Sequence, residues 1–240
     1  RMNHLHPPFD NLKARQALML AIAQEDFLRA QVGDPEIYRV CNAPLVCGSK
    51  YEKSYGDLLI KPDFEKAKAL LKEAGYDGTP IVLLQSTTLP VLTNMAPVTK
   101  ALLEQAGFKV DMQAMDFSTF VTRRLNPKTV QEGGWNVAHT TNTVPDQGDP
   151  LSNPFLVAVG PPASAYGWPT DPTIEALKIK FATAPDLAVR KAVAADIQKR
   201  AYEQVLYLPL AQFTTPSAWR DNLNGVLKSP VMLLYNIEKK

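Results

Sequence analysis

The sequence carries little net charge and no long apolar run. Its 240 residues include 26 Lys and Arg against 24 Asp and Glu, which gives a net charge of +2. A nucleic-acid-binding protein normally shows a clustered basic face, so no nucleic-acid partner is expected. The longest apolar stretches, residues 18–23 and 231–235, are far shorter than the roughly 20 residues of a membrane span. We therefore expect no direct insertion into a membrane.

Glycine is also scarce, while proline is abundant. The chain has 12 Gly and 20 Pro among 240 residues, or about 5% and about 8%. The usual shares are about 7% for Gly and about 5% for Pro. Hydrophobic residues make up 45% and charged residues 21%, which excludes a disordered or fibrous chain. Much of the proline lies around residues 35–62 and 145–172, so we expect stiff loops there. The length allows one large domain or two small ones.

The common sequence signatures of catalysis are absent. The chain has no P-loop, no Gly-x-Gly-x-x-Gly, no His-Glu-x-x-His and no Gly-x-Ser-x-Gly. No cofactor and no metal site is therefore predicted, although His4 and His6 form a His-x-His pair. The best acid pair is Asp146 and Asp149, which could perform general acid–base catalysis as in a glycosidase. Because Asp-Gln-Gly-Asp-Pro is more commonly an ordinary turn, a hydrolase is only the alternative interpretation.

The two cysteines and the first residues bear on the compartment. Cys41 and Cys47 do not have the Cys-x-x-Cys spacing of zinc and redox sites, and no His lies near enough to complete a metal set. A disulfide that closes a short loop fits, and it would indicate an oxidising compartment; two buried free thiols are the alternative. Residues 1–8 lack the apolar core of a signal peptide. We expect a cytosolic chain, a mature form or a piece of a longer protein.

Apolar residues at helical spacing, bounded by capping residues, predict a series of helices. These helices cover residues 11–32, 64–74, 91–106, 117–125, 172–184 and 187–205. The expected N-caps and glycine stops are Asp10, Asp63, Asp116, Asp186, Gly33, Gly75 and Gly107. The inner face of the last helix is predicted to consist of Val189, Val193, Ile197 and Ala201.

Short apolar or alternating runs predict strands between these helices. The strands cover residues 81–84, 108–114, 135–141 and 206–213, and residues 34–62 are predicted as a long loop. Residues 70–76 and 102–108 share a helix end, a Gly stop and an aromatic residue, at a spacing typical of one βα unit. This alternation predicts an α/β fold with a mainly parallel sheet flanked by helices. Ligands bind at the carboxyl ends of the strands in such sheets.

Two loops that follow predicted strands are the candidate binding elements. Thr87 and Thr88 lie between a strand end and a helix start, where N–H groups and hydroxyls could hold a carboxylate or another polar group. The second loop, residues 133–143, contains two ambiguous residues. Trp135 is either a core aromatic or a stacking platform for a ligand. His139 is either a hydrogen-bonded structural residue or a ligand contact.

The strongest candidates follow the end of the 135–141 strand, where a cleft would open. These are Asn142, Thr143 and Asp146. Arg124 could pair with an anionic ligand, although a helical pair of arginines such as Arg123 and Arg124 is commonly only solvated.

Several segments resemble one protein family, in that family's order along the chain. The opening Pro7-Pro-Phe-Asp-Asn-Leu12 and the residues that follow it resemble the extracytoplasmic solute-binding proteins of family 5. These are the dipeptide, oligopeptide and nickel receptors of ABC importers. The other matching segments are residues 63–76, 101–110, 133–136, 208–213 and 222–225. Because they are spread over nearly the whole chain, the resemblance is specific.

The resemblance implies a fold and a function. It implies a periplasmic-binding-protein-like lobe II over residues 1–207. Residues 208–240 would form a hinge and return segment that belongs to lobe I, most of which lies outside this sequence. The protein would be a periplasmic receptor and not an enzyme. It would capture a peptide or peptide-like solute between two lobes and deliver it to the permease subunits of an ABC importer, its only link to the membrane. The cysteine loop resembles one found in a subset of the family.

The resemblance also bears on the site residues. In peptide-binding members, a Trp and an Asp from the loop after this strand hold the amino terminus of the ligand. Asp146 matches the acid after a small shift, whereas Asn142 stands near the Trp position and departs from that pattern. Each lobe of a hinged receptor gives half of the polar contacts. We therefore expect weak or undetectable solute affinity for these 240 residues alone.

Overall fold

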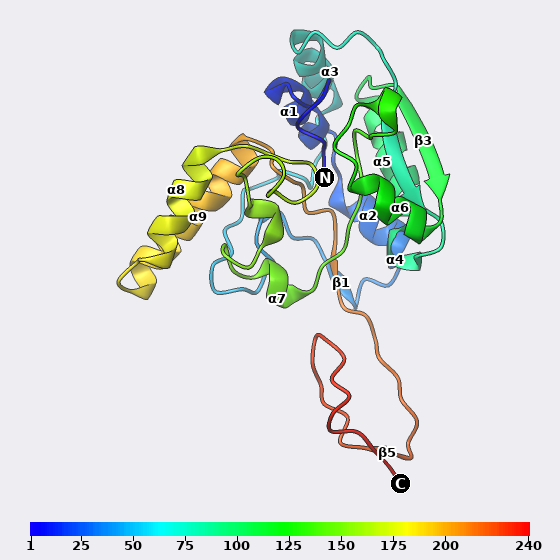
Figure 1. The fold of residues 1–240 in the computed structure, drawn as a ribbon, viewed down its shortest axis with the longest axis vertical. Coiled ribbons are helices and arrows are strands. Elements are labelled where there is room, and N and C mark those ends of the chain that lie inside the picture. Colours follow the sequence, from blue (N-terminus) through cyan, green and yellow to red (C-terminus); the bar gives the residue numbers. More distant parts are fainter.

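The computed structural model describes residues 1–240 and contains a small parallel sheet with helices on both faces (Figure 1). Strands β2 (Ile81–Ser86) and β3 (Val110–Met115) pair in parallel, with Ile81 opposite Val110. On the other side of β2, Val137 forms a parallel bridge with Leu83 and an antiparallel bridge with Met2. The predicted α/β class with a parallel sheet is thereby confirmed.

The apolar residues of β2 contribute to two different cores. Ile81 and Leu83 belong to the largest core, which includes side chains of the helices before and after β2. Val82 and Leu84 belong to a second core that contains Phe120, Trp135 and Trp168. Successive residues of a strand point to opposite faces of the sheet. Because both faces of β2 are covered, its sequence is continuously apolar rather than alternating.

The helices of the structure agree with most of the predicted ones. They are α1 (Leu12–Leu20), α2 (Gln24–Gln31), α3 (Phe64–Glu73), α4 (Pro90–Thr93), α5 (Met95–Gln105), α6 (Phe117–Arg124), α7 (Val144–Gln147), α8 (Pro172–Ala182) and α9 (Leu187–Glu203). The remaining strands are β1 (Tyr38–Arg39), β4 (Gln212–Phe213), β5 (Leu223–Asn224) and β6 (Glu238–Lys239). None of the helices has the length and apolar character that crossing a bilayer requires.

Three of the four predicted N-caps are confirmed. The side chain of Asp63 accepts a hydrogen bond from the third residue of its helix. The side chains of Asp116 and Asp186 do the same at α6 and α9. This is the usual way to satisfy a free N–H at a helix start. The prediction of Asp10 is wrong, because the side chain of Asn11 accepts from Lys13 N at 2.8 Å and α1 begins one residue later.

Two predicted helices are each divided into two. The 11–32 helix breaks before α2 because Asp63 N donates to Leu20 O and Gln24 N donates to Leu59 O. The backbone groups at the break thus pair with the segment before α3. The 91–106 helix breaks between α4 and α5 because Pro97 has no N–H for the carbonyl of Thr93. That carbonyl instead accepts from the Gln85 side chain at 3.1 Å.

Two predicted strands are shorter than expected. In the 135–141 segment only Val137 forms bridges. In the 206–213 segment only Gln212 and Phe213 form a strand, antiparallel to β1. The predicted inner face of α9 is confirmed at Ile197 and Ala201 and wrong at Val189. Val189 is 42% exposed, and the buried residues of α9 are Ala194, Ile197, Gln198, Ala201 and Tyr202.

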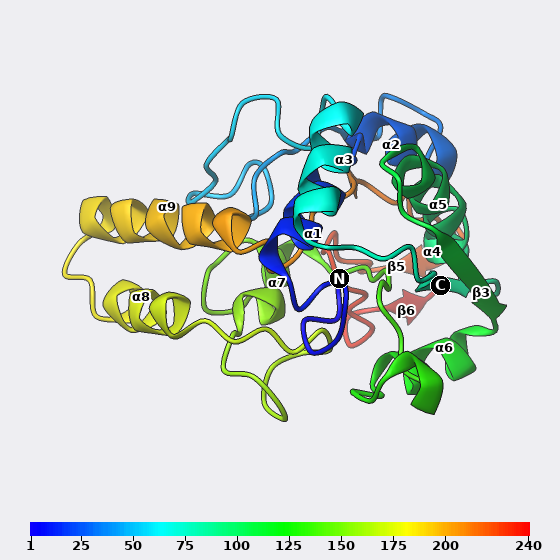
Figure 2. The same cartoon turned by 90° about the horizontal axis from the view of Figure 1, so that it is seen from above.

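Residues 1–3 join the sheet to a third core beneath α8 and α9, which pack side by side (Figures 1 and 2). Asn3 N donates to Asn136 O at 2.9 Å, beside the sheet. The guanidinium of Arg1 donates to Tyr166 O at 2.9 Å and to Leu206 O at 3.0 Å, on the side of the third core. The beginning of the chain therefore lies against the segment that follows α9.

The last residues, 214–240, extend away from the rest of the chain (Figure 1). After Thr214 N, which donates to Ile37 O, the hydrogen bonds of this segment are all internal to it. Several of its apolar side chains are exposed, with Met232 at 84% and Tyr235 at 82%. The segment contributes no residue to the three cores.

Candidate functional site

The carboxyl ends of β2 and β3 meet at one edge of the sheet, where two predicted residues lie. Thr87 N and Oγ1 both donate to Met115 O, at 2.9 and 3.0 Å. Thr88 Oγ1 accepts a hydrogen bond from Phe117 N, the first residue of α6, at 2.9 Å. Thr87 and Thr88 are exposed. They join the two strand ends and the start of α6, and they face solvent at the edge where ligands of parallel sheets bind.

Arg124 is the last residue of α6, at the opposite end of this helix from the contact with Thr88. Its Nη1 donates to Thr140 Oγ1 at 3.3 Å, and its guanidinium carbon lies 4.1 Å from the centre of the Tyr166 ring. The Phe120 ring, one helical turn earlier, is 5.4 Å away. Burial lowers the pKa of Arg124. Arg124 is therefore not the fully solvated arginine of the alternative interpretation but a half-buried one, with its guanidinium over two aromatic rings.

Trp135 is fully buried beneath this arginine. Its ring packs at 6.0 Å from that of Trp168, and its Nε1 donates to Arg124 O at 3.0 Å. A buried indole normally finds such a partner for its N–H. Trp135 therefore serves the core and fixes the backbone of Arg124, and its role as a stacking platform stays a prediction.

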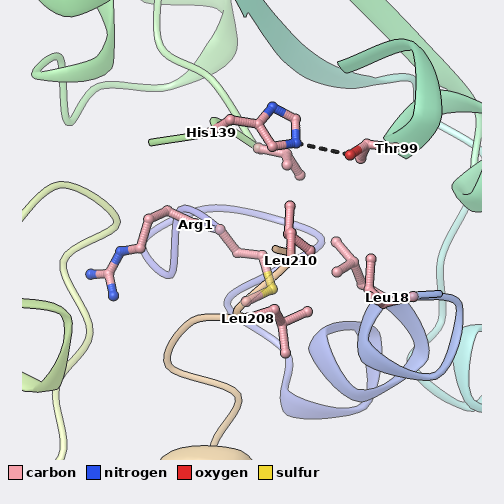
Figure 3. A pocket seen from close by; sticks show the side chains of 9 residues that line it. Arg1, Leu18, Thr99, His139, Leu208 and Leu210 are labelled. Carbon is pink, nitrogen blue, oxygen red and sulfur yellow. Dashed lines mark hydrogen bonds between the residues drawn. The ribbon is translucent and has the colours of Figure 1, made fainter. Parts of the chain in front are cut away.

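His139 points into the interior rather than toward the exposed edge (Figure 3). Its Nε2 forms a 2.8 Å hydrogen bond with Thr99 Oγ1. The adjoining cavity, of about 20 Å³, is lined largely by apolar side chains such as Leu18 and Leu208. A space of that size holds a single water at most. Burial lowers the pKa of His139 to about 3, so the imidazole is neutral at physiological pH.

Two of the three candidates after the strand form a local motif, in which Asn142 takes no part. Thr143 and Asp146 make a capping box at the start of α7, and Thr143 Oγ1 donates to Asp146 Oδ2 at 2.8 Å. Asn142 and Asp146 are exposed. Asp149 accepts from Leu151 N at 2.9 Å. Both carboxylates of the alternative hydrolase pair thus serve a cap and a turn, and nothing in their geometry favours catalysis.

The predicted disulfide is present, and its loop packs against α7. Cys41 is bonded to Cys47. Between them, Val46 N donates to Gln147 O at 3.1 Å, so the loop supports the segment that carries Asp146. No group of three His, Cys, Asp or Glu side chains is gathered as metal ligands would be.

The predicted site residues therefore fall into separate groups. Thr87 and Thr88 lie at the strand ends. Arg124 lies over Trp135, and Thr143 pairs with Asp146 at α7. No hydrogen bond or ion pair joins Asp146 to Arg124.

Sequence reasoning missed the partners that define the Arg124 and His139 surroundings. These partners are Tyr166, Thr140 and Thr99. Tyr166 lies in the proline-rich 145–172 stretch, where no periodic pattern marks it. The only signal was an aromatic residue between Ala165 and Gly167 in a loop.

Comparison with known proteins assigns the chain to a family. The profile of "Bacterial extracellular solute-binding proteins, family 5 Middle" matches residues 1–160. A "probable peptide ABC transporter periplasmic-binding protein" of Sinorhizobium fredii is 34% identical over 241 residues, which covers 100% of this chain and 45% of that protein. The "Di/tripeptide-binding protein 2" of Pseudomonas aeruginosa is 28% identical, over 96% of this chain and 43% of that protein. The chain thus spans a little under half the length of these relatives.

Solved structures have the same fold. A dipeptide-binding protein from Pseudoalteromonas sp. SM9913 in complex with Met-Leu has a TM-score of 0.78 at 24% identity, over 100% of this chain and 47% of that one. HbpA2 from Haemophilus parasuis has a TM-score of 0.75 at 20% identity, over 100% and 47%. These likenesses confirm the predicted periplasmic-binding-protein-like fold. Taken with the profile match, they place this chain among the bacterial extracellular solute-binding proteins of family 5.

Proposed function

We propose that this chain is part of a receptor for an ABC importer that captures a peptide or peptide-like solute between two lobes. The observation that carries the proposal is the match along the whole chain to the Sinorhizobium fredii relative, whose name describes a peptide ABC transporter periplasmic-binding protein. The receptor acts in the periplasm, delivers its solute to the permease subunits and contacts the membrane only through them. It binds and releases its solute without chemical change, so it is not an enzyme.

The proposed domain organisation places residues 1–207 in lobe II and residues 208–240 in a hinge and return segment of lobe I. Exposed apolar side chains support it, since a large exposed apolar patch marks an interaction surface. Trp219, Met232 and Tyr235 are 49%, 84% and 82% exposed. Deleting residues 216–240 should change the melting temperature by less than about 2 °C, because these residues contact no core. A drop of more than about 5 °C would contradict this assignment.

The proposed solute site lies at the carboxyl edge of the sheet. It comprises Thr87, Thr88, Arg124, Asn142, Thr143 and Asp146, with Trp135 and His139 behind them. The exposed hydroxyl, amide and carboxylate groups suit a polar solute. The carboxylate of Asp146 would pair with its amino group.

Calorimetry on the complete receptor and on these 240 residues tests the proposal. The complete receptor should bind a di- or tripeptide, whereas the chain alone should bind it too weakly to measure. Micromolar or tighter binding by the 240 residues alone would contradict capture between two lobes. Failure of the complete receptor to bind any peptide would contradict the solute class.

Two acidic variants of the complete receptor provide a matched comparison. Asp146→Asn should weaken peptide binding at least about tenfold, because it removes a charge-assisted hydrogen bond. Asp149→Asn removes the same charge from a carboxylate that accepts from Leu151 N, and it should bind as the wild type does. Mass spectrometry of the peptide after incubation should find it intact. Hydrolysis of the peptide by the wild type, but by neither variant, would favour the hydrolase interpretation instead.

A further inference from the structure

The guanidinium of Arg124 is half-buried and has no carboxylate beside it. None of the ion pairs involves this residue. Its Nε is buried without a hydrogen-bond partner, and its one hydrogen bond is the 3.3 Å contact with Thr140 Oγ1. Withdrawing a charge from water without a partner costs free energy. The buried Nε–H is therefore unfavourably placed unless an acceptor comes to lie beside it.

Two other arginines show a guanidinium with a structural role whose donors are well used, whereas Arg190, with a buried unpartnered Nε and one 3.3 Å hydrogen bond to Ala184 O, resembles Arg124. Arg1 donates to the carbonyl oxygens of Phe155, Ala165, Tyr166 and Leu206. Arg15 donates to those of Phe9, Asp10 and Gln204. Their donors are directed at backbone acceptors, as expected for buried polar groups. Arg124 has the same five N–H donors but uses one of them, on a hydroxyl.

The surroundings of Arg124 hold its side chain in a fixed orientation. The Tyr166 ring lies 4.1 Å and the Phe120 ring 5.4 Å from the guanidinium carbon, so the group lies over two aromatic rings. Trp135 Nε1 holds the backbone carbonyl of Arg124 from below. The edge of the guanidinium, with its parallel N–H groups, remains beside Thr140, just after the Val137 bridge at the sheet edge. Parallel N–H groups in this arrangement match the two oxygens of a carboxylate.

We propose that Arg124 is a recognition residue of the solute site and that the solute presents a carboxylate to it, with the Thr140 hydroxyl alongside. This inference rests on the proposed receptor function and adds the chemical group that the site selects. It also assigns opposite ends of the solute to two separate places, the amino group to Asp146 and the carboxylate to Arg124. The same carboxylate chemistry could come from an acidic side chain elsewhere in the receptor, so the experiment separates these two sources.

The experiment compares variants of the complete receptor with two probes, the dipeptide Met-Leu and its C-terminal amide. Arg124→Gln removes the charge, Arg124→Lys keeps it without the planar fork, and Arg123→Gln is the control. Arg123 carries the same charge one residue earlier, but its donors are used by Gly133 O and Gly134 O at 3.1 and 3.3 Å. Calorimetry gives the affinity of each protein variant for each probe, and the melting temperature without solute reports on folding.

The wild type and Arg123→Gln should bind the free acid at least about tenfold more tightly than the amide. Arg124→Gln should lose most of that preference with its melting temperature within about 2 °C of the wild type, and Arg124→Lys should be intermediate. Equal affinity of the wild type for acid and amide would overturn the proposal. An equal loss of affinity for both probes in Arg124→Gln would also overturn the proposal. It would show that Arg124 pairs with a carboxylate of the receptor or has a structural role.

Mass spectrometry of the solute released by denaturing the receptor decides the case in which Met-Leu does not bind. A released solute that carries a carboxylate, retained by the wild type and lost from Arg124→Gln, supports the role of Arg124 even if the solute is not a peptide. A released solute without an acidic group overturns that role and leaves the receptor function intact. A receptor that binds neither probe and retains no solute overturns both proposals.

Discussion

Replacing both Cys41 and Cys47 with serine tests whether the disulfide acts mainly on the unfolded chain. The native loop is held at each end by a glutamine side chain as well as by the sulfur bond. Gln24 exchanges two hydrogen bonds with the backbone of Cys41, at 2.6 and 2.8 Å. Gln212 does the same with Cys47, at 2.9 and 2.9 Å. Because these four hydrogen bonds do not depend on the disulfide, we expect the variant to keep the native loop.

The expected loss of stability then comes from the entropy of the unfolded chain. The cysteines are six positions apart, so the bond closes a short loop. The chain-entropy relation gives about 2 kcal/mol for a loop of this length at 25 °C. For a chain of this size, each kcal/mol shifts the melting temperature by about 2–4 °C. The double serine variant should therefore melt about 4–8 °C lower than the oxidised wild type.

Scanning calorimetry and hydrogen exchange measure the two parts of this prediction. The wild type in a reducing agent should melt as the double variant does, and reductant should not change the variant. The amides of Cys41 and Cys47, which donate to Gln24 and Gln212, should stay protected from exchange. A loss of more than about 15 °C with rapid exchange of both amides would refute the reasoning, because the disulfide would then hold the native loop itself. A loss below about 1 °C would refute the entropy estimate.

Three further predictions concern stability. Gly134→Ala should lower the free energy of unfolding by more than about 2 kcal/mol in urea denaturation, because its Cβ would lie 1.9 Å from Lys128 O, and normal stability would contradict this backbone contact. The pKa of His139 is lowered to about 3, so the unfolded chain takes up the proton first and stability falls as pH drops below about 6.5. His139 alone should contribute up to about 3 kcal/mol of loss between pH 6.5 and 4.5, and His139→Gln should melt with a flatter pH profile; an unchanged profile would show that the histidine is accessible. Asp63→Ala should cost about 1 kcal/mol, since Asp63 accepts from Lys66 N, whereas an unchanged melting temperature would show that the cap contributes nothing.

Much of the fold could be predicted because its signals are local. Asp63, Asp116 and Asp186 mark helix starts through bonds to a residue three positions later, which the sequence alone displays. The β2 run shows that both faces of that strand are buried. The breaks in two helices were not predicted, because one depends on the distant segment 59–63. The other depends on Pro97, whose missing N–H is visible in the sequence but whose effect is masked by the helical spacing of the apolar residues on both sides of it.

The candidate site was less predictable, because a side chain's role depends on what lies beside it. His139 sits in a predicted strand segment, but only the packing of Thr99 and Leu208 around it shows that it faces the interior. Arg124 lies on a helix, where the sequence alone does not show what packs against it. Its aromatic neighbour Tyr166 lies 42 positions later, in an irregular loop. Asp146 is exposed, and its role as a solute ligand stays a prediction, whereas the capping box that it forms with Thr143 was not predicted.

The contact between Arg1 and Leu206 has a mechanical consequence. The two residues are joined by a 3.0 Å hydrogen bond although they are 205 positions apart. Beyond Leu206 the backbone stays attached to the rest of the chain as far as Thr214, whose N–H donates to Ile37 O. A pulling force applied at residue 1 and at the 214–240 segment would therefore load these attachments before the β2–β3 pairing, because they lie nearer to both points of loading.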